Sequence, residues 1–414
     1  MMEVINPRCA GLDVHKKSIS ACCISRSATG ARIFERRTFG TMTTDILMLG
    51  EWLHSLDIPI VALESTGVYW KPIWNLLESD FDLMLVNPQH IKQVPGRKTD
   101  VKDAEWIATL LEHGLLRASF VPPAPHRAFR ELTRTRSTLI RQRSELVNRV
   151  QKVLEDANIK LASVATDVMG VSGRAMIEAM VVGETDPKVL ASLAVRGLRN
   201  KQEELEQALL GRVADHHRII IKQFLSLIDA LDSSIAELEK HIGEASSSFR
   251  DVVDRLDAIP GVGPVTAQMI LSEIGTDMDA FPSDRHLCAW SGLAPGNNES
   301  AGKQLPGRPR KGNRSLRTGL IQAAHAAARS KGTYLSALYR RIAARRGNKK
   351  ATVAVAHAIL KAVYHMIVRQ TAYHELGEDY YDKLSPRRTA PRLIRRLREM
   401  GYTVTKQPDA ANPA

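Results

Sequence analysis

The first part of the chain alternates between short apolar runs and amphipathic segments, separated by polar turns. Short apolar runs bounded by turn residues predict strands, whereas apolar positions three or four residues apart predict helices. Three strands are expected in succession, at 9–14, 18–25 and 31–39, joined by two tight hairpins. The elements expected after them are a helix at 43–55, a strand in PIVALE, a helix from about Tyr69, a strand at 82–86 and a helix over 100–113.

This order of elements predicts an α/β domain of ribonuclease-H-like fold, because three strands in a meander are followed by alternating helices and strands. In such a sheet the first strand is central, and its neighbour is the strand that ends in Glu64. The fold class expected for the whole chain is α/β plus α, since the sequence beyond about residue 122 has helical periodicity.

A proline cluster at 122–125 breaks the α/β pattern and indicates a domain boundary. A long helix is expected over 126–158, and a second helical region over 187–242 has apolar residues at three- and four-residue intervals. Those residues are Leu198, Leu205, Leu209, Ile228, Leu231, Ile235, Leu238 and Ile242. The spacing predicts antiparallel helices that form a coiled-coil arm.

Four regions are therefore expected along the chain. They are the α/β domain at 1–122, a helical linker and dimerisation arm at 123–250, a compact helical domain at 251–372 and a basic tail at 373–414. The tail ends in a Pro/Ala-rich stretch, and we expect part of it to be disordered.

The charge of the chain favours a polyanionic partner. Lysine and arginine number 58 against 45 aspartates and glutamates, a formal net charge of +13, and the sequence pI is near 9.6. Nucleic acid is the first candidate partner and an anionic membrane surface the second. No apolar stretch approaches the roughly 20 residues that span a bilayer, and residues 1–8 carry no signal-peptide core, so we expect a cytoplasmic protein.

The cysteines show no spacing typical of a metal site. Cys9, Cys22, Cys23 and Cys288 contain no CxxC pair, so neither a zinc knuckle nor a disulfide framework is predicted. We expect buried, reduced thiols.

Four carboxylates lie where one site could gather them. Asp13 is in the first expected strand, Glu64 ends the strand VALE, and Asp100 and Asp103 share one face of a helix. Carboxylate oxygens suit hard cations, and two Mg²⁺ ions about 4 Å apart can stabilise both sides of an in-line phosphoryl displacement. We therefore expect all four acids to be catalytic metal ligands. Taken singly, each is more often a helix cap, a strand end or half of a surface ion pair.

The segment LDAIPGVGPVTAQMILSEIG resembles a helix-hairpin-helix DNA-binding motif, with Gly261 and Gly263 between two helical stretches. Glycine lets backbone N–H groups approach a phosphate, and the N-terminus of the following helix favours an anion. We expect both glycines to contact the nucleic-acid backbone without reading its sequence. The alternative is a plain Gly/Pro turn between packed helices.

A loop rich in Gly, Asn and Pro follows the apolar run CAWSGLAP and contains Ser300 beside Ala301 and Gly302. The small neighbours leave the hydroxyl accessible, so a serine nucleophile activated by a metal or a base is chemically feasible. Basic residues that can neutralise a phosphodiester there are Lys303, Arg308, Arg310, Lys311 and Arg314. From the residues alone, the simpler interpretation is a DNA-contacting loop whose serine donates a hydrogen bond to phosphate. Ser291, in an apolar run, and Ser315, in the expected first turn of a helix, are weaker candidates for the nucleophile.

Five blocks occur in a characteristic order along the chain: GLDVHKKS, ALESTGVYW, NPQHIKQVPGRKTDVKDAEWIATLL, IPGVGPVTA and GLAPGNNESAGK. Together they resemble the DEDD-type insertion-sequence transposases of the IS110 family, over about 9–367. The resemblance implies a RuvC-like N-terminal domain, a coiled-coil linker and a C-terminal transposase domain. In it, Asp13, Glu64, Asp100 and Asp103 match the DEDD acids.

The resemblance also implies a mechanism and partners. Ser300 aligns with a catalytic serine that attacks DNA to give a covalent phosphoserine, while the acids supply Mg²⁺. The two halves of one active site are expected from different protomers of a dimer or tetramer, and recombination passes through a junction intermediate. A structured guide RNA encoded by the element is expected to pair with donor and target DNA. Where the family often has Ser-Gly-Gly, this chain has Ala301 after the serine, and alanine is nearly as small.

Two other functions fit the same residues. One is a structure-specific junction nuclease, in which metal-activated water attacks and Ser300 only binds phosphate. The other is a non-catalytic architectural protein whose DNA binding would ignore Mg²⁺ and survive Asp13→Ala. The four-acid pattern argues against the second.

Overall fold

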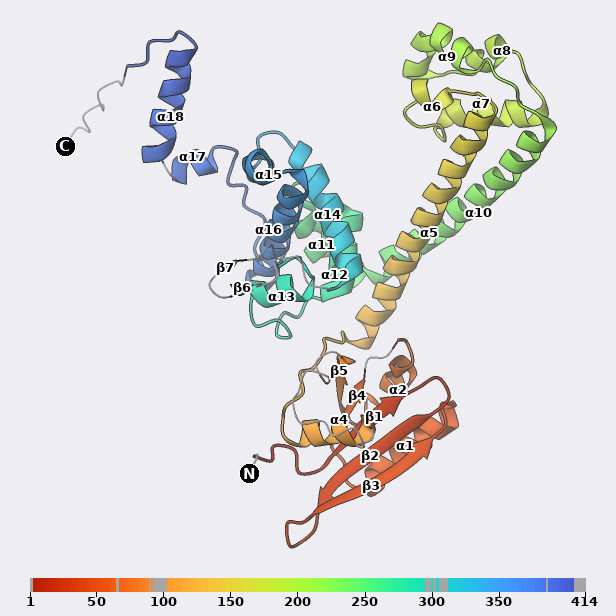
Figure 1. Ribbon diagram of the computed structural model, residues 1–414. Coiled ribbons are helices and arrows are strands. Elements are labelled where there is room, and N and C mark those ends of the chain that lie inside the picture. The colour runs from red at the N-terminus through yellow and green to blue at the C-terminus, as the bar shows by residue number, and fades with distance from the viewer. Residues whose placement is uncertain are drawn as a thin grey trace. The chain divides into compact units, whose positions relative to one another are not determined.

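The computed structural model describes residues 3–64, 67–88, 91, 103–294, 299–300, 303–304, 312–384 and 386–405, with side chains left undescribed at 299–300, 303–304, 386–389 and 392. The chain forms two compact units, residues 1–124 and 125–414 (Figure 1).

The N-terminal unit is built on a mixed five-stranded sheet. Its strands are β1 (Cys9–Val14), β2 (Ile19–Arg26), β3 (Arg32–Phe39), β4 (Ile60–Glu64) and β5 (Asp82–Val86). They lie in the order β3-β2-β1-β4-β5, in which β1, β2 and β3 pair antiparallel while β4 and β5 run parallel to β1. The predictions that β1 is central and that the Glu64 strand is its neighbour are confirmed.

Helices cover both faces of this sheet. The even-numbered residues of β1, Leu12 among them, face a core formed with α1 (Thr43–Ser55) and α2 (Trp70–Leu77). The odd-numbered residues face α4 (Asp103–Glu112), as Cys9 does. The strict alternation follows from the two-residue period of a strand, and it separates two cores across one sheet.

The second unit begins with two long helices that run antiparallel, side by side (Figure 1). They are α5 (Ala124–Asp156) and α10 (Asp215–Ala245), and we call the pair the arm. Ion pairs join Arg136 to Glu239 and Arg143 to Asp232, so residue numbers fall along α10 as they rise along α5.

A small helical cluster joins the far ends of the arm helices, and we call it the tip. It contains α6 (Leu161–Val164), α7 (Val171–Val182), α8 (Pro187–Ser192), η1 (Arg196–Lys201) and α9 (Gln202–Ala208). Leu205 and Leu209 are buried in its core, and Leu198 packs against it. The prediction of an arm over 187–242 is therefore wrong for its first part. Periodic apolar residues show that one helix face is buried, but they do not show what covers it.

The rest of the second unit is a helical domain around α16 (Asn348–Arg369). Its other elements are η2 (Ser247–Phe249), α11 (Arg250–Asp257), α12 (Pro264–Ile274), α13 (Asp284–Trp290), β6 (Glu299–Ser300), β7 (Lys303–Gln304), α14 (Arg314–Arg329) and α15 (Tyr334–Arg346). Two further helices follow, α17 (Tyr380–Leu384) and α18 (Pro386–Glu399).

The apolar character of α16 corrects one expectation from the sequence. By length and composition, this 22-residue helix is apolar enough to cross a membrane. It packs instead against α13, α14 and α15, and Val355, Ile359 and Val363 are fully buried there. A central core helix and a membrane span satisfy the same test of composition, because both are surrounded by apolar groups.

Candidate active site

Two of the predicted acids lie at the carboxyl ends of neighbouring parallel strands. The register of β1 and β4 pairs Gly11 with Ala62 and Leu12 with Leu63, so Asp13 and Glu64 each come one residue after the last pair. Both acids lie two residues beyond a position that faces α4. Because strand side chains alternate, Asp13 and Glu64 share the α4 face of the sheet.

The third described acid is brought to the same edge by a close contact between helix and strand. A Cβ atom on Gly11 would lie 2.4 Å from both the Ala104 carbonyl oxygen and the Ala108 nitrogen, so α4 crosses directly over β1. Two residues earlier on the same face of the strand, Cys9 Sγ lies 3.5 Å from the Ala108 carbonyl oxygen. The helix therefore runs opposite to the strand, and its first residue, Asp103, lies toward the end of β1 that carries Asp13.

Asp13 is partly buried on the α4 face of the sheet, where 18% of its side chain is exposed. Its Oδ2 lies 3.1 Å from Nε2 of His15. A partly buried carboxylate costs free energy unless a partner compensates its charge, and a cation serves that purpose.

The acids do not form a closed cage by themselves. Among the described residues, Asp13, Glu64 and Asp103 are not a group whose carboxylate oxygens all lie within 4.8 Å of one another. The prediction for Asp100 lies outside the described residues. The structure thus places three acids at one edge of the sheet, and the assignment of all four as metal ligands stays a prediction.

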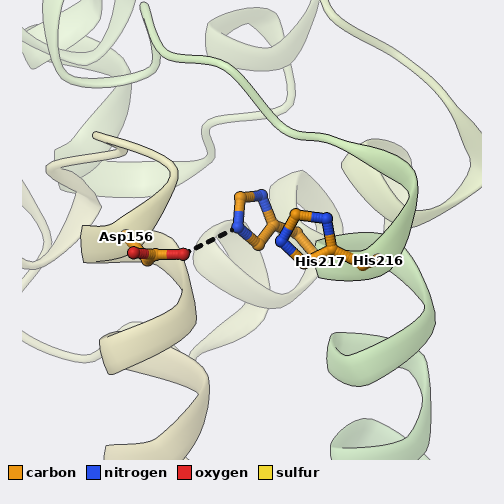
Figure 2. A group of neighbouring side chains, drawn as sticks. All are labelled: Asp156, His216 and His217. Carbon is orange, nitrogen blue, oxygen red and sulfur yellow. Dashed lines mark hydrogen bonds and ion pairs between the residues drawn. The ribbon is translucent and has the colours of Figure 1, made fainter.

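One compact group of potential metal ligands occurs where the arm meets the tip (Figure 2). Asp156, His216 and His217 have ligand atoms within 4.8 Å of one another, the one such group in the described ranges. His217 Nδ1 accepts the Ala214 N–H at 3.2 Å, so its proton is on Nε2, which donates to Asp156 Oδ2 at 2.9 Å. A metal on Nε2 would remove that proton while the amide still points at Nδ1. The geometry therefore favours a helix cap with a polar pair over a metal site.

The two glycines of the hairpin between α11 and α12 have different surroundings. Gly261 has φ +85°, and a Cβ there would lie 2.4 Å from the Ala323 carbonyl oxygen of α14. Gly263 is exposed, precedes the first residue of α12 and has open space where a Cβ would be. No side chain caps this helix; its first residue, Pro264, has no N–H, and the Ala267 N–H donates to the Gly263 carbonyl oxygen at 2.9 Å. The N–H groups of Val265 and Thr266 precede the first intrahelical acceptor. The contacts of both glycines with DNA stay predictions.

In the serine loop, residues 293–311, the structure describes 293–294 and two short strands. β6 pairs antiparallel with β7, which places Ser300 opposite Lys303. The predicted phosphate contacts Arg308, Arg310 and Lys311 lie outside the described residues. Arg314 is exposed and is the first residue of α14.

The two ends of the serine loop meet at a neck, residues 290–292 and 312–313. The Asn313 N–H donates to the Trp290 carbonyl oxygen at 3.2 Å. A Cβ on Gly312 would lie 2.3 Å from the Gly292 nitrogen, so only glycine allows this approach. Asn313 also caps α14, because its Oδ1 accepts the Leu316 N–H at 3.1 Å.

The two alternative serines, Ser291 and Ser315, lie in regular parts of the helical domain. Ser291 is completely buried, and its hydroxyl donates to the Cys288 carbonyl oxygen at 2.9 Å. Ser315 lies in the first turn of α14, as its sequence predicted. Ser291 therefore has no access to a DNA strand in this structure.

Glu273 is a residue that sequence reasoning missed. It lies near the end of α12, is completely buried and forms hydrogen bonds with Arg134 and with Asn313 at the neck. Burial lowers the pKa of the neighbouring Arg130 to about 10, against the opposing attraction of Glu273. The only signal in the sequence is a single acid in the apolar run AQMILSEIG.

Two transposase family models match the segments that contain the acids and the serine loop. A DEDD-type transposase model named for IS110 matches residues 10–159, and a model described as the IS116/IS110/IS902 transposase family matches residues 253–340. A probable family 20 transposase of Pseudomonas aeruginosa is 28% identical, over 78% of this chain and 88% of its own length. The transposase for insertion sequence element IS1111A of Coxiella burnetii is 26% identical, over 88% of this chain and 90% of its own. The transposase for IS1328 of Yersinia enterocolitica is 24% identical, over 76% and 82%.

Proposed function

Since the chain belongs to the IS110 family of insertion-sequence transposases, we propose that it cuts and rejoins DNA strands of a mobile element. The observation that carries the proposal is the shared sheet edge at which Asp13, Glu64 and Asp103 lie. In this proposal the N-terminal unit is a ribonuclease-H-like, RuvC-like nuclease domain. The net charge of +13 suits a polyanionic substrate.

The proposed cofactor is a pair of Mg²⁺ ions held by Asp13, Glu64, Asp100 and Asp103. Carboxylates are the hard oxygen donors that Mg²⁺ prefers, and a cation would compensate the charge of the partly buried Asp13 carboxylate, 18% of which is exposed. When bound, the ions would stabilise the charge on the attacking and leaving oxygens of a phosphodiester.

Ser300 is the proposed nucleophile. Its Oγ forms a bond to the phosphorus of the DNA backbone, the bond from phosphorus to one ester oxygen breaks, and that strand end leaves as a hydroxyl. Attack by a second strand's hydroxyl then reverses these bonds and rejoins DNA without loss of the phosphate. The register of β6 and β7 pairs Ser300 with Lys303, a basic residue of the kind that binds phosphate.

The DNA backbone is the proposed ligand of the hairpin and of the basic residues around the loop. The uncapped first turn of α12, preceded by the exposed Gly263, offers N–H groups to a phosphate. Gly261 supports this turn, since its left-handed backbone lets the hairpin pack against α14. Arg308, Arg310, Lys311 and Arg314 are the proposed contacts that neutralise phosphates near the serine.

Sequence choice is proposed to come from a guide RNA encoded by the element, with the protein gripping backbone and shape. The protein is then expected in the cytoplasm, where it can reach the DNA. Its low aromatic content, 5% of residues, agrees with limited base stacking by the protein itself.

We place the contact between protomers on the arm. A groove of about 360 Å³ opens between α5 and α10, lined in part by Leu146, Leu227 and Leu231. Leu227→Asp is expected to yield monomers by light scattering, whereas Ser226→Asp adds the same charge at an exposed neighbouring position and should leave the mass unchanged. An unchanged mass for Leu227→Asp would remove the arm from the interface.

The proposed chemistry is tested by looking for DNA covalently attached to protein. Purified protein is incubated with Mg²⁺, the junction DNA of its element, target DNA and the flanking transcript, and the products are separated on a denaturing gel. We expect an adduct in the wild type and none in Ser300→Ala or Asp13→Asn. An adduct that persists in Ser300→Ala would move the nucleophile to another residue. Cleavage that leaves a free 5′-phosphate and no adduct would favour a junction nuclease that uses water.

A further inference from the structure

Glu273 is a buried carboxylate bonded from two separate segments of the second unit. Arg134 of α5 forms a bidentate pair with it, in which Nε donates to Oε1 at 2.7 Å and Nη2 donates to Oε2 at 2.8 Å. Arg130 Nε lies 3.2 Å from Oε2, and the same guanidinium donates to the backbone carbonyls of Ser272 and Glu273. The base of the arm is thereby attached to the last turn of α12.

The same carboxylate reaches the neck of the serine loop. Asn313 Nδ2 donates to Glu273 Oε2 at 2.6 Å, while Asn313 Oδ1 caps α14 and its N–H binds Trp290. Both polar atoms of the Asn313 side chain are therefore hydrogen-bonded, which fixes its amide group in one orientation. Glu273 thus joins three elements that are far apart in sequence, namely α5, α12 and the start of α14.

Energetics explain why this contact resists rearrangement. An ionised carboxylate with no exposed surface is costly unless cations and donors compensate it, and Glu273 has two arginines and an amide. Removing one partner leaves charge buried without compensation, so the partners hold a defined geometry. The arm base and the loop neck consequently cannot move independently.

We propose that Glu273 is a positioning residue, which holds the neck of the serine loop in register with the base of the arm so that Ser300 is presented for attack. The inference rests on the proposed function of Ser300. It adds that the orientation of the arm and the placement of the nucleophile are linked through one carboxylate. The amide of Asn313 is the link on the side of the loop, and Arg134 is the link on the side of the arm.

The test uses the full-length protein and a readout that does not depend on catalysis. Hydrogen–deuterium exchange is followed in peptides that cover 288–294 and 312–320, the two sides of the neck. In Glu273→Gln we expect exchange at the neck to rise about tenfold, because a charge-assisted hydrogen bond is lost there. The rate of adduct formation should fall by a similar factor or more, while DNA binding measured without Mg²⁺ changes less than about threefold.

Asn313→Ser is the second variant, because serine caps a helix as well as asparagine but has no amide to donate to Glu273. It leaves Glu273 paired with both arginines and should show the same faster exchange at the neck. The matched control is Glu112→Gln, which also replaces a completely buried glutamate between two arginines, Arg26 and Arg32, but in the other unit. It should leave exchange at the neck unchanged.

The outcomes separate this proposal from the proposed function. Unchanged exchange at the neck in both Glu273→Gln and Asn313→Ser would overturn the positioning role, as would faster exchange with an unaltered rate of adduct formation. If the wild-type protein forms no adduct, the proposed nucleophile fails. The exchange experiment would still show whether Glu273 holds the neck, but the role in presenting Ser300 would be lost with the nucleophile.

Discussion

Gly11 in the central strand lies against Ala104 in α4, at a distance that leaves no room for a Cβ atom. A Cβ on Gly11 would be 2.4 Å from the Ala104 carbonyl oxygen, which is backbone and cannot turn away. Any side chain at position 11 must therefore push α4 from the sheet. Asp103 begins that helix, so the acid would leave the edge that holds Asp13 and Glu64.

The first prediction concerns this contact. Gly11→Ala should slow strand cleavage by about 100-fold, because a displacement of about 1 Å at a catalytic group has that effect. Cleavage rates are measured beside circular dichroism, which should still show a folded chain. Gly243→Ala is the control, since a Cβ in α10 there meets nothing within 4 Å. A Gly11→Ala protein with wild-type cleavage would mean that the position of α4 does not matter for the reaction.

The second prediction separates the two glycines of the hairpin. Gly261→Ala should lower the free energy of unfolding by about 2 kcal/mol or more, because it combines a left-handed backbone with a clash against α14. Gly263→Ala has open space and φ −85°, so its stability should stay within about 0.5 kcal/mol of the wild type. Its affinity for duplex DNA should fall, since the added methyl group lies beside the proposed phosphate contact. Denaturant unfolding and filter binding measure the two effects, and equal losses of stability would refute this division.

The third prediction concerns the junction of arm and tip. His217→Ala should cost about 1 kcal/mol of stability, because it removes the imidazole that accepts the Ala214 N–H at the start of α10, whereas the exposed Asp156 can be solvated. His216→Ala should have little effect, since His216 is exposed. Added Zn²⁺ should not raise the melting temperature of the wild type. A rise that depends on His216 would instead identify the group as a metal site.

The fourth prediction follows from two partly buried histidines, His126 and His357. Burial lowers the pKa of His126, helped by the nearby Arg130, and it lowers the pKa of His357. In the unfolded chain the histidine pKa is about 6.5, so below that pH the unfolded chain binds more protons than the folded chain does. Stability should be fully present above that pH and should decline as the pH falls below it. Urea unfolding from pH 8 to 5 should show this decline, and the double variant His126→Gln, His357→Gln should flatten it. An equal slope in the double variant would contradict the assignment.

The fifth prediction concerns the thiols. All four cysteines are free and buried, as the sequence predicted, and burial raises the pKa of Cys9 to about 12 and of Cys22 to about 11. A thiol that is both inaccessible and protonated reacts slowly. Ellman's reagent should label no cysteine in the native protein within minutes and all four in guanidinium. Rapid labelling of a native thiol would show that one of these sites opens.

The sequence by itself determined the features that depend on local pattern. Short apolar runs between turn residues located the strands of the N-terminal sheet to within a residue, because the burial of a strand is visible in its own residues. The same patterns, read in order, placed β4 beside the central β1 and so brought Asp13 and Glu64 to one edge. The roles of Asp100 and Ser300 remain predictions from the family resemblance.

Only the tertiary structure decided which buried faces meet. The periodic leucines of 187–242 did not reveal that Leu205 lies in the tip, or that α10 pairs with α5. Nothing near Glu273 in the sequence indicates Asn313, 40 residues away, or Arg134 on the arm. Periodicity shows that a face is covered, whereas the partner is chosen by packing over the whole chain. Buried charges in particular depend on neighbours that are distant in sequence.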